Sequence, residues 1–319
     1  MTETNTSGII TAAADIIAGA FNALPKRVCN QHKFSDYADY LHENLPAQAE
    51  LDLQREKPLN PAPLVSVAIA CSGASRAAVR STLEALGKQT YANFEVCVVS
   101  ELAQAGLTDY EGIPKFRLVL FNGTAHEQLK AAEKMLNGAY FLQLLPGDLP
   151  APDALHMLVL QTHSNPEAEV VFADEDSVID GIRQNPIFKP DYGRDTLRSF
   201  NSIGRPMLVS KRVHTAVGGF RGSTPAELWA YCIECASAAK QVIHIARIGL
   251  TVIRDCDGSE IPCTDILKRE FNSLYPGDGS GKKNRTNGYC FEGSVLGTLR
   301  MRYPRKREPS VGIVIAGAD

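Results

Sequence analysis

Short apolar runs rich in β-branched residues alternate with longer segments of helical periodicity through the middle of the chain. The runs have the length and composition of buried strands, and they cover residues 64–71, 94–100, 116–121, 138–145 and 169–173. The segments between them predict helices. Strands and helices that alternate at this length predict an α/β fold, Rossmann-like, with a mostly parallel sheet flanked by helices.

Cap residues predict where these helices begin. Ser75 is the expected N-cap of the helix after the first strand. Thr124 and Glu127 have the spacing of a capping box, for a helix that runs to about Leu136. Pro152 is expected at the first position of the helix that follows the fourth strand.

The N-terminal part of the chain has a different pattern. Residues 1–60 look like a helical arm, with apolar positions on one helical face between residues 9 and 24 and a polar helical stretch around Tyr37–Glu43. A proline-rich linker at Pro58–Pro63 follows. The first helix either docks on the domain or a partner protein, or lies in a membrane interface.

The pattern divides the rest of the chain into three parts. The α/β domain is expected over 61–255, and an extension or linker over 256–308. Residues 309–319 repeat, in register, the proline and alternating Val/Ile positions of the first strand. This echo predicts the start of a second, truncated domain.

Composition narrows the class of protein. The 319 residues carry a net charge of −3, so no basic field favours nucleic acid. Eight scattered cysteines without a secretion signal indicate reduced thiols and a cytoplasmic protein. The sequence contains no run of about 18 apolar residues, so no transmembrane helix is expected. If the first helix binds lipid, the expected location is the inner face of the cytoplasmic membrane.

Ligands of parallel α/β sheets bind at the carboxyl ends of the strands. Polar residues at those predicted ends are Ser72, Ser100, Glu101, Asp148 and the acidic run Asp174-Glu175-Asp176. Asp148 alone is a weak site for Mg²⁺ or Mn²⁺, which prefer several oxygen ligands. Asp148 is otherwise a turn residue of Pro146-Gly147-Asp148.

From Pro63 to about Arg254 the chain resembles the bacterial family 2 glycosyltransferases of O-antigen and other surface polysaccharide assembly. The matching segments are PLVSVAIA with QTYANFEVCVVS, NGAYFLQLLPGDLPAPDAL, VVFADEDSVIDGIRQNPIFKPDY and VHTAVGGFRG. The resemblance implies a GT-A fold and transfer of a sugar from a nucleotide sugar to a glycan acceptor. It also implies Mn²⁺ or Mg²⁺ as cofactor, and the first domain of a tandem-like protein.

Candidate site residues come partly from this resemblance and partly from residues that could substitute for family groups that are missing here, as Glu227 could for the base. Catalytic roles fall on Glu227, Asp174 and Asp176, and a metal-binding role on Asp148. Residues expected to bind the nucleotide sugar are Ser72, Ser100, Glu101, Asp148, Glu175, Lys189, Asp191 and Arg254. Two alternatives stay open: Glu227 also fits the third position of a capping box, and Lys189 with Asp191 also fits a surface ion pair.

Four positions depart from the family pattern. Ser100-Glu101 stands where the family usually has two aspartates, and Leu145–Asp148 stands where it has its Asp-x-Asp-Asp metal clamp. Pro225 occupies the position of the family's catalytic Asp, and Thr251 occupies the position of a His. Transfer needs a cation for the leaving diphosphate, a base and a held nucleotide. The sequence therefore predicts a weakened or inactive transferase. The alternative is a pseudo-glycosyltransferase that acts as a binding or scaffold subunit for another transferase, with the N-terminal helix as its contact.

Overall fold

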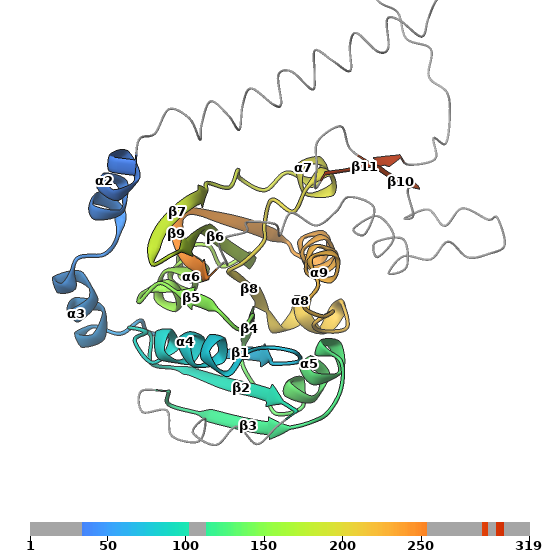
Figure 1. Ribbon diagram of the computed structural model, residues 1–319, viewed down its shortest axis with the longest axis horizontal. Helices are drawn as coiled ribbons and strands as arrows, with labels where there is room; N and C mark the ends of the chain where they lie inside the picture. Colours follow the sequence, from blue (N-terminus) through green and yellow to red (C-terminus); the bar gives the residue numbers. More distant parts are fainter. Residues whose placement is uncertain (1–33, 102–112, 254–288, 293–297, 303–319) are drawn as a thin grey trace, which may run out of the picture.

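The computed structural model describes residues 34–101, 113–253, 289–292 and 298–302, and a nine-stranded sheet dominates it (Figure 1). The strand order is β3-β2-β1-β4-β8-β6-β9-β5, and β7 pairs with the outer part of β6. Six strands run in one direction: β1 (Val65–Ala70), β2 (Phe94–Ser100), β3 (Phe116–Leu120), β4 (Tyr140–Leu144), β6 (Ala168–Ile179) and β9 (Gln241–Ile253). Three run in the other: β5 (Asp148–Pro150), β7 (Ile182–Ile187) and β8 (Met207–Ser210). The predicted α/β fold with a mostly parallel sheet is confirmed.

Helices pack on both faces of this sheet. On one face, α4 (Arg76–Leu86) and α6 (Ala154–Ser164) share a buried core with Val65, Val67 and Ile69 of β1. On the other, Ala68 and Ala70 face a second core with helices α5 (Ala125–Glu133), α7 (Arg194–Ser199), α8 (Lys211–Ala216) and α9 (Pro225–Ala238). Because successive strand residues point to opposite faces, β1 is buried on both, as its continuous apolar run predicted.

The predicted helix starts are confirmed at two positions and wrong at one. The Ser75 side chain accepts from the Ala78 N–H, and Thr124 with Glu127 forms a complete capping box. The helix expected to begin at Pro152 begins instead at Ala154. The Ala151 N–H donates to the Gly249 carbonyl (3.0 Å), so this segment stays beside β9 before the helix can start.

A second correction concerns the acidic run. The strand predicted over 169–173 continues to Ile179, so Asp174, Glu175 and Asp176 lie inside β6 and not at its end. Extra pairing causes the extension, because the outer part of β6 pairs with β7 on one side and with β9 on the other. The β6–β9 register shifts at Asp174, where the ladder is irregular.

Two short helices of the arm precede the sheet. Helix α2 (Phe34–Asn44) confirms the predicted helical stretch around 37–43, whereas α3 (Gln48–Glu56) was not predicted, because its pattern is polar and only Leu51 is buried. The Tyr37 hydroxyl donates to Asp176 Oδ2 at 2.6 Å, and the Tyr40 ring packs edge-on against Phe188. These contacts hold α2 against β6 and the segment after β7. The helix predicted between residues 9 and 24 lies outside the described residues.

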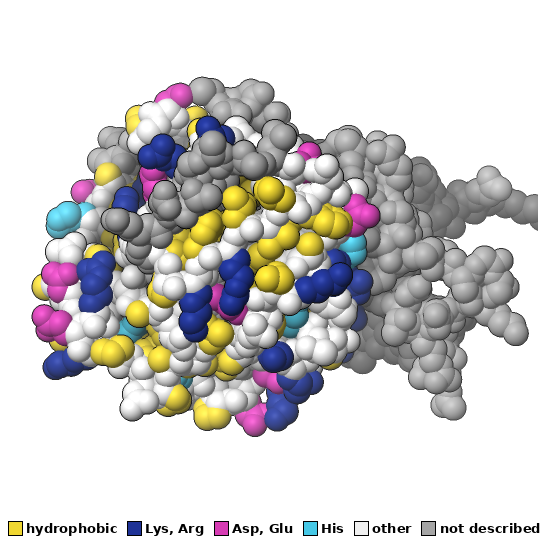
Figure 2. All heavy atoms as spheres, turned by 90° about the horizontal axis from the view of Figure 1, so that it is seen from below, with side chains coloured by type: hydrophobic (Ala, Val, Ile, Leu, Met, Phe, Trp, Pro, Cys, Tyr) yellow, Lys and Arg dark blue, Asp and Glu magenta, His cyan; other side chains and the backbone are white. Residues whose placement is uncertain are grey.

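Two further features complete the described chain. Strands β10 (Tyr289–Glu292) and β11 (Leu299–Arg302) form a separate antiparallel pair. At the edge of the large sheet, β3 leaves Leu120 and neighbouring Phe121 exposed, and Figure 2 shows hydrophobic and basic side chains mixed on the face seen from below. Within the described ranges, no helix is long and apolar enough to cross a membrane.

The buried carboxylate of Glu95 predicts a specific loss of stability in acid. Glu95 accepts from Ser66 Oγ and the Asn137 N–H at 2.6 Å each, and from Arg117 at 2.7 Å. Burial alone would raise the pKa of Glu95, but these donors hold it below its ordinary value. At pH values between the pKa of Glu95 in the folded state and its pKa in the unfolded state, the folded protein therefore binds fewer protons than the unfolded protein. The free energy of unfolding is therefore expected to fall as the pH drops below about 4.5.

Urea unfolding at a series of pH values between neutral and acid tests this. Glu95→Gln removes the titrating group. The free energy of unfolding of this variant is therefore expected to depend less steeply on pH in the acid range than that of the wild-type protein. Identical slopes for the two proteins in that range would show that Glu95 does not carry the effect.

Candidate functional site

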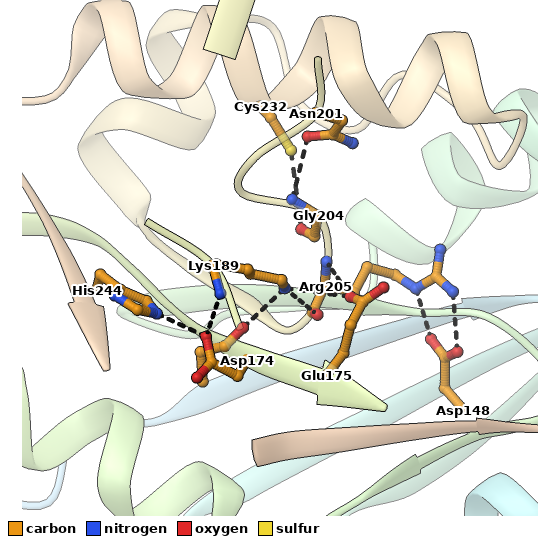
Figure 3. Close-up of polar contacts among 10 residues, drawn as sticks. Asp148, Asp174, Glu175, Lys189, Asn201, Gly204, Arg205, Cys232 and His244 are labelled. Atoms are coloured by element: carbon orange, nitrogen blue, oxygen red, sulfur yellow. Dashed lines mark hydrogen bonds and ion pairs between the residues drawn. The ribbon is translucent and has the colours of Figure 1, made fainter. Parts of the chain in front are cut away.

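The carboxylate of Asp148, at the predicted clamp position, forms a bidentate ion pair with Arg205 (Figure 3). Arg205 Nε donates to Asp148 Oδ2 at 2.8 Å, and Nη2 donates to Oδ1 at 3.0 Å. The Leu145 N–H also donates to Oδ2, at 2.8 Å. The side chain of Asp148 is 1% exposed and that of Arg205 19%. Both oxygens of the clamp carboxylate are thus committed to donors.

Arg205 is also held through its backbone. Its N–H donates to Glu175 Oε2 (3.3 Å), and its carbonyl accepts from Lys189 Nζ at 2.7 Å. Lys189 Nζ further donates to the Ala173 carbonyl (2.7 Å) and to Glu175 Oε2 (3.1 Å). The ammonium of Lys189 therefore has an acceptor for each of its three hydrogens. This network ties the loop before β8 to strand β6.

The preceding residue, Gly204, lets the loop approach this network. Its φ is +54°, in the left-handed region that favours glycine. A Cβ there would lie 3.2 Å from Glu175 Oε2 and 3.4 Å from Lys189 Nζ. Both the backbone conformation and the close contacts thus require glycine beside Arg205.

The charges in the cluster stabilise one another. Burial alone would lower the pKa of Arg205, but Asp148 and Glu175 raise it above its usual value. Burial also disfavours ionised Glu175, yet Lys189 and Arg205 hold the pKa of that carboxyl below its ordinary value. Burial raises the pKa of Asp148, and Arg205 limits the rise. The arrangement is therefore one of paired charges, with two carboxylates and two cations.

Asp174 lies beside this cluster and pairs with a histidine. His244 Nε2 lies 2.7 Å from Asp174 Oδ1, and its Nδ1 lies 3.3 Å from Asp191 Oδ1. The Lys189 N–H also donates to Asp174 Oδ1, at 2.9 Å. The structure thus brings Asp174, Lys189 and Asp191 together, although Lys189 pairs with Glu175 and not with Asp191.

Asp176 has partners on the arm side. Its Oδ2 accepts from Arg183 Nε (2.8 Å) and from the Tyr37 hydroxyl, whereas its buried Oδ1 has no hydrogen-bond partner among the described residues. Burial and the bond to Asp176 raise the pKa of Tyr37, so Tyr37 acts as a hydroxyl donor. The predicted catalytic carboxylate Asp176 is therefore covered by the helix α2.

Ser72 and Glu101 meet at the carboxyl ends of β1 and β2. Ser72 Oγ donates to Glu101 Oε1 at 3.3 Å, and the Cys71 and Ser72 N–H groups both donate to Gln128 Oε1, at 2.9 and 3.0 Å. Ser100 is buried at the end of β2. These residues form the side of the site that was predicted to bind the nucleotide.

The turn that contains Asp148 is hydrogen-bonded to helix α4, which begins just after Ser72, so it lies next to this side of the site. The Gly147 N–H donates to Thr82 Oγ1 (2.9 Å), and strands β1 and β4 lie side by side in the sheet, with Ile69 opposite Leu144. Arg254 lies outside the described residues. The predicted residues thus fall into two adjacent groups. One contains Ser72, Ser100 and Glu101 at the ends of β1 and β2, and the other contains Lys189 and the acidic residues near Arg205. The paired charges lie only in the second group.

Glu227 lies in the first turn of α9, where its carboxylate bonds to Thr224 and not to a residue of either group. It completes a capping box with Thr224, in which Glu227 Oε2 accepts from the Thr224 N–H at 3.0 Å. Pro225 occupies the first turn of the helix. The capping alternative is therefore seen in the structure, and a role for Glu227 as catalytic base stays a prediction.

The capping box gives Glu227 a test that separates cap from base. Glutamine preserves the box, so Glu227→Gln is expected to change the free energy of unfolding by less than about 0.5 kcal/mol, whereas Thr224→Ala is expected to cost about 1 kcal/mol. Thermal or urea unfolding measures both. A loss of about 2 kcal/mol in Glu227→Gln would contradict the cap, and the loss of any nucleotide-sugar turnover measured in the parent, at unchanged stability, would indicate the base.

A divalent cation does not fit the described residues as they stand. Mg²⁺ and Mn²⁺ take several oxygen ligands, but both oxygens of Asp148 already accept from Arg205 and Leu145. The described parts of the chain contain no group of three or more His, Cys, Asp or Glu side chains able to hold a metal ion. Metal binding by Asp148 stays a prediction, and a metal ion there would compete with Arg205 for the carboxylate.

Arg205, His244 and Arg183 are the site residues that the sequence did not reveal. Each is 7 to 70 residues from its acidic partner along the chain. Arg183 lies within the segment VVFADEDSVIDGIRQNPIFKPDY but was not singled out, and Arg205 and His244 lie in none of the matching segments. The one local signal is the Gly204-Arg205-Pro206 turn that precedes β8, and such a turn does not specify a partner.

The chain has the fold of a GT-A glycosyltransferase. Solved structures of S. aureus TarS share it: one structure of TarS matches at a TM-score of 0.50 and 13% identity, covering 67% of this chain and 40% of that one. TarS 1–349 in complex with UDP-GlcNAc also matches at a TM-score of 0.50, with 14% identity and 67% of each chain covered.

Two curated proteins are similar in sequence. The uncharacterised protein y4gI of Sinorhizobium fredii is 30% identical over 199 residues, which is 58% of this chain. The O-antigen biosynthesis protein RfbC of Myxococcus xanthus is 24% identical over 223 residues, or 67% of this chain. The matched region spans only 22% and 18% of the length of those relatives. No model of a known protein family matches the chain.

Proposed function

We propose that this chain is a family 2-type glycosyltransferase domain of cell-surface polysaccharide synthesis, of the O-antigen type, that binds a nucleotide sugar and has weakened or lost transfer activity. The fold shared with TarS, which has been solved with UDP-GlcNAc, supports nucleotide-sugar binding. The similarity to an O-antigen biosynthesis protein supports the pathway. The acceptor is a glycan, and the expected location is the cytoplasm or the inner face of the cytoplasmic membrane.

The ion pair between Asp148 and Arg205 is the observation that carries the loss of activity. It occupies the clamp position with both carboxylate oxygens engaged. The neighbouring acidic residues are paired as well: Glu175 with Lys189, Asp176 with Arg183 and Asp174 with His244. A carboxylate held by a cation is a poor metal ligand and a poor base.

The expected size of the defect follows from the groups that are engaged. Removing one group that stabilises developing charge typically costs about 10²–10³ in rate. Removing a general base costs about 10²–10⁴. A site with neither in place is therefore expected to turn over a nucleotide sugar at rates close to the uncatalysed background.

A turnover assay tests the proposal. The protein is incubated with UDP-, GDP- and dTDP-sugars, with Mn²⁺, and release of the nucleoside diphosphate is followed together with the melting temperature. We expect the matching nucleotide to raise the melting temperature while release stays near the blank. Release at about 1 s⁻¹ or faster, within the usual range of enzymes, would contradict the weakened activity.

The alternative, a scaffold subunit for another transferase, predicts a different result in the same assay. A scaffold of this kind has no use for the nucleotide. A folded protein whose melting temperature responds to none of the three nucleotides would therefore contradict nucleotide binding and favour the scaffold.

A further inference from the structure

The guanidinium of Arg205 is a fixed positive charge at the position where GT-A transferases are expected to place a metal. We infer that Arg205 takes the place of the divalent cation in this chain, so that the site binds the diphosphate of a nucleotide without metal and through Arg205. The inference rests on the proposed function, because it concerns the same nucleotide site.

Position is the first support. Asp148, which holds Arg205, lies in the turn after β4, and this turn bonds to α4 through Gly147 and Thr82. Helix α4 begins just after Ser72, at the carboxyl end of the neighbouring strand β1. Ligands of α/β sheets bind outside these strand ends. The cation is therefore on the ligand side of the sheet.

Rigidity is the second support. Arg205 is anchored at three points: its N–H by Glu175, its carbonyl by Lys189 and its side chain by Asp148. Two parallel N–H···O bonds to one carboxylate also fix the plane of the guanidinium. Because the group is already ordered, binding an anion costs little further side-chain entropy.

Unused donors are the third support. Arginine has five N–H donors, and Asp148 engages Nε and one hydrogen of Nη2. Among the described residues, nothing accepts from Nη1, and Figure 3 shows this nitrogen pointing away from Asp148. The side chain is 19% exposed, so this edge is within reach of a ligand. Guanidinium donors in a plane match the oxygens of a phosphate.

The charge of the site explains why a metal is not needed and is not favoured. Arg205 and Lys189 balance Asp148 and Glu175, so these four side chains together carry no net charge that would attract a divalent cation. The pair Asp148–Arg205 is neutral as a whole, and its contribution to binding is therefore a set of directed hydrogen bonds and not a long-range field. Lys189 takes no direct part, because its three hydrogens already have acceptors.

Calorimetric titration with UDP, GDP and dTDP, in EDTA and in Mn²⁺, tests the inference on the full chain. The test variant combines Arg205→Gln with Asp148→Asn, which removes both charges and leaves no unpaired buried carboxylate. The control is Arg212→Gln, which breaks the ion pair with Glu169 at the other end of β6. Circular dichroism and thermal unfolding confirm that each variant is folded.

The wild type and Arg212→Gln are expected to bind one of the nucleotides equally well in EDTA and in Mn²⁺, within about 2-fold. The double variant is expected to bind about 10- to 100-fold more weakly, which is the usual range for a lost hydrogen bond to a charged group, and Mn²⁺ is not expected to restore it. That pattern would support Arg205 as the resident cation.

Three results would overturn the inference, and they are distinguishable. Wild-type binding that tightens 10-fold or more with Mn²⁺ would keep the proposed function and exclude metal-free binding. Unchanged affinity in the folded double variant would keep metal-free binding and exclude Arg205. No binding of any nucleotide to the folded wild type, in either condition, would contradict the proposed function and with it the inference.

Discussion

Arg205→Ala is expected to lower the free energy of unfolding by about 3–5 kcal/mol, the usual cost of removing one partner of a buried ion pair. Asp148 is 1% exposed and would keep only the Leu145 N–H as a donor. A carboxylate left unpaired in the interior either keeps its charge at a high cost or takes up a proton. Urea unfolding at neutral pH measures the loss.

The double variant with Arg205→Gln and Asp148→Asn is the control for this prediction. It removes both charges and keeps polar groups of similar shape, so it is expected to be clearly more stable than Arg205→Ala. The difference separates an unpaired charge from lost packing. A loss below about 1 kcal/mol in Arg205→Ala would match the value of exposed pairs and would contradict a buried ion pair.

Lys189→Met is expected to cost about 3 kcal/mol or more, by the same reasoning. The Lys189 side chain is 3% exposed, and Nζ donates to two carbonyls, those of Ala173 and Arg205, and to Glu175. Methionine fills much of the same volume but removes this donor from the two carbonyls and leaves Glu175 Oε2 with the Arg205 N–H as its donor. The loss is again measured by urea unfolding.

A surface lysine provides the matched control. Lys240 pairs with Glu167 at 3.2 Å, and both side chains are more than half exposed, so Lys240→Met is expected to change stability by less than about 1 kcal/mol. Lys189→Met is also expected to weaken nucleotide binding, because it releases the Arg205 carbonyl. Equal effects of Lys189→Met and Lys240→Met on the free energy of unfolding would contradict a stabilising role for the buried hydrogen bonds of Lys189.

Five strands of the sheet, β1 to β4 and the first part of β6, were predictable from the sequence because their signals are local, whereas β5, β7, β8 and β9 were not predicted. The run VSVAIA needs two covered faces wherever it lies, and β1 has both. The capping boxes at Thr124 and Thr224 span four residues each and depend on nothing distant. Helix α3 was missed because its polar pattern provides almost no buried position.

The site was less predictable because its contacts are between distant residues. The sequence identified Asp148 and the acidic run, but it did not indicate that Arg205 lies beside Asp148, 57 residues away. It placed Asp174–Asp176 at a strand end because strand EVVFA has no apolar residue at the next three positions. The strand continues because pairing with β7 and β9 stabilises it, and partners of this kind are set by the whole fold.

If Arg205 binds the diphosphate of a nucleotide in place of a metal, a nucleotide must bind to this chain when no divalent cation is present. Calorimetric titration of the wild-type protein with UDP, GDP and dTDP in EDTA measures this. We expect micromolar binding of one of them with no metal present. Binding that appears only after Mn²⁺ is added would contradict it.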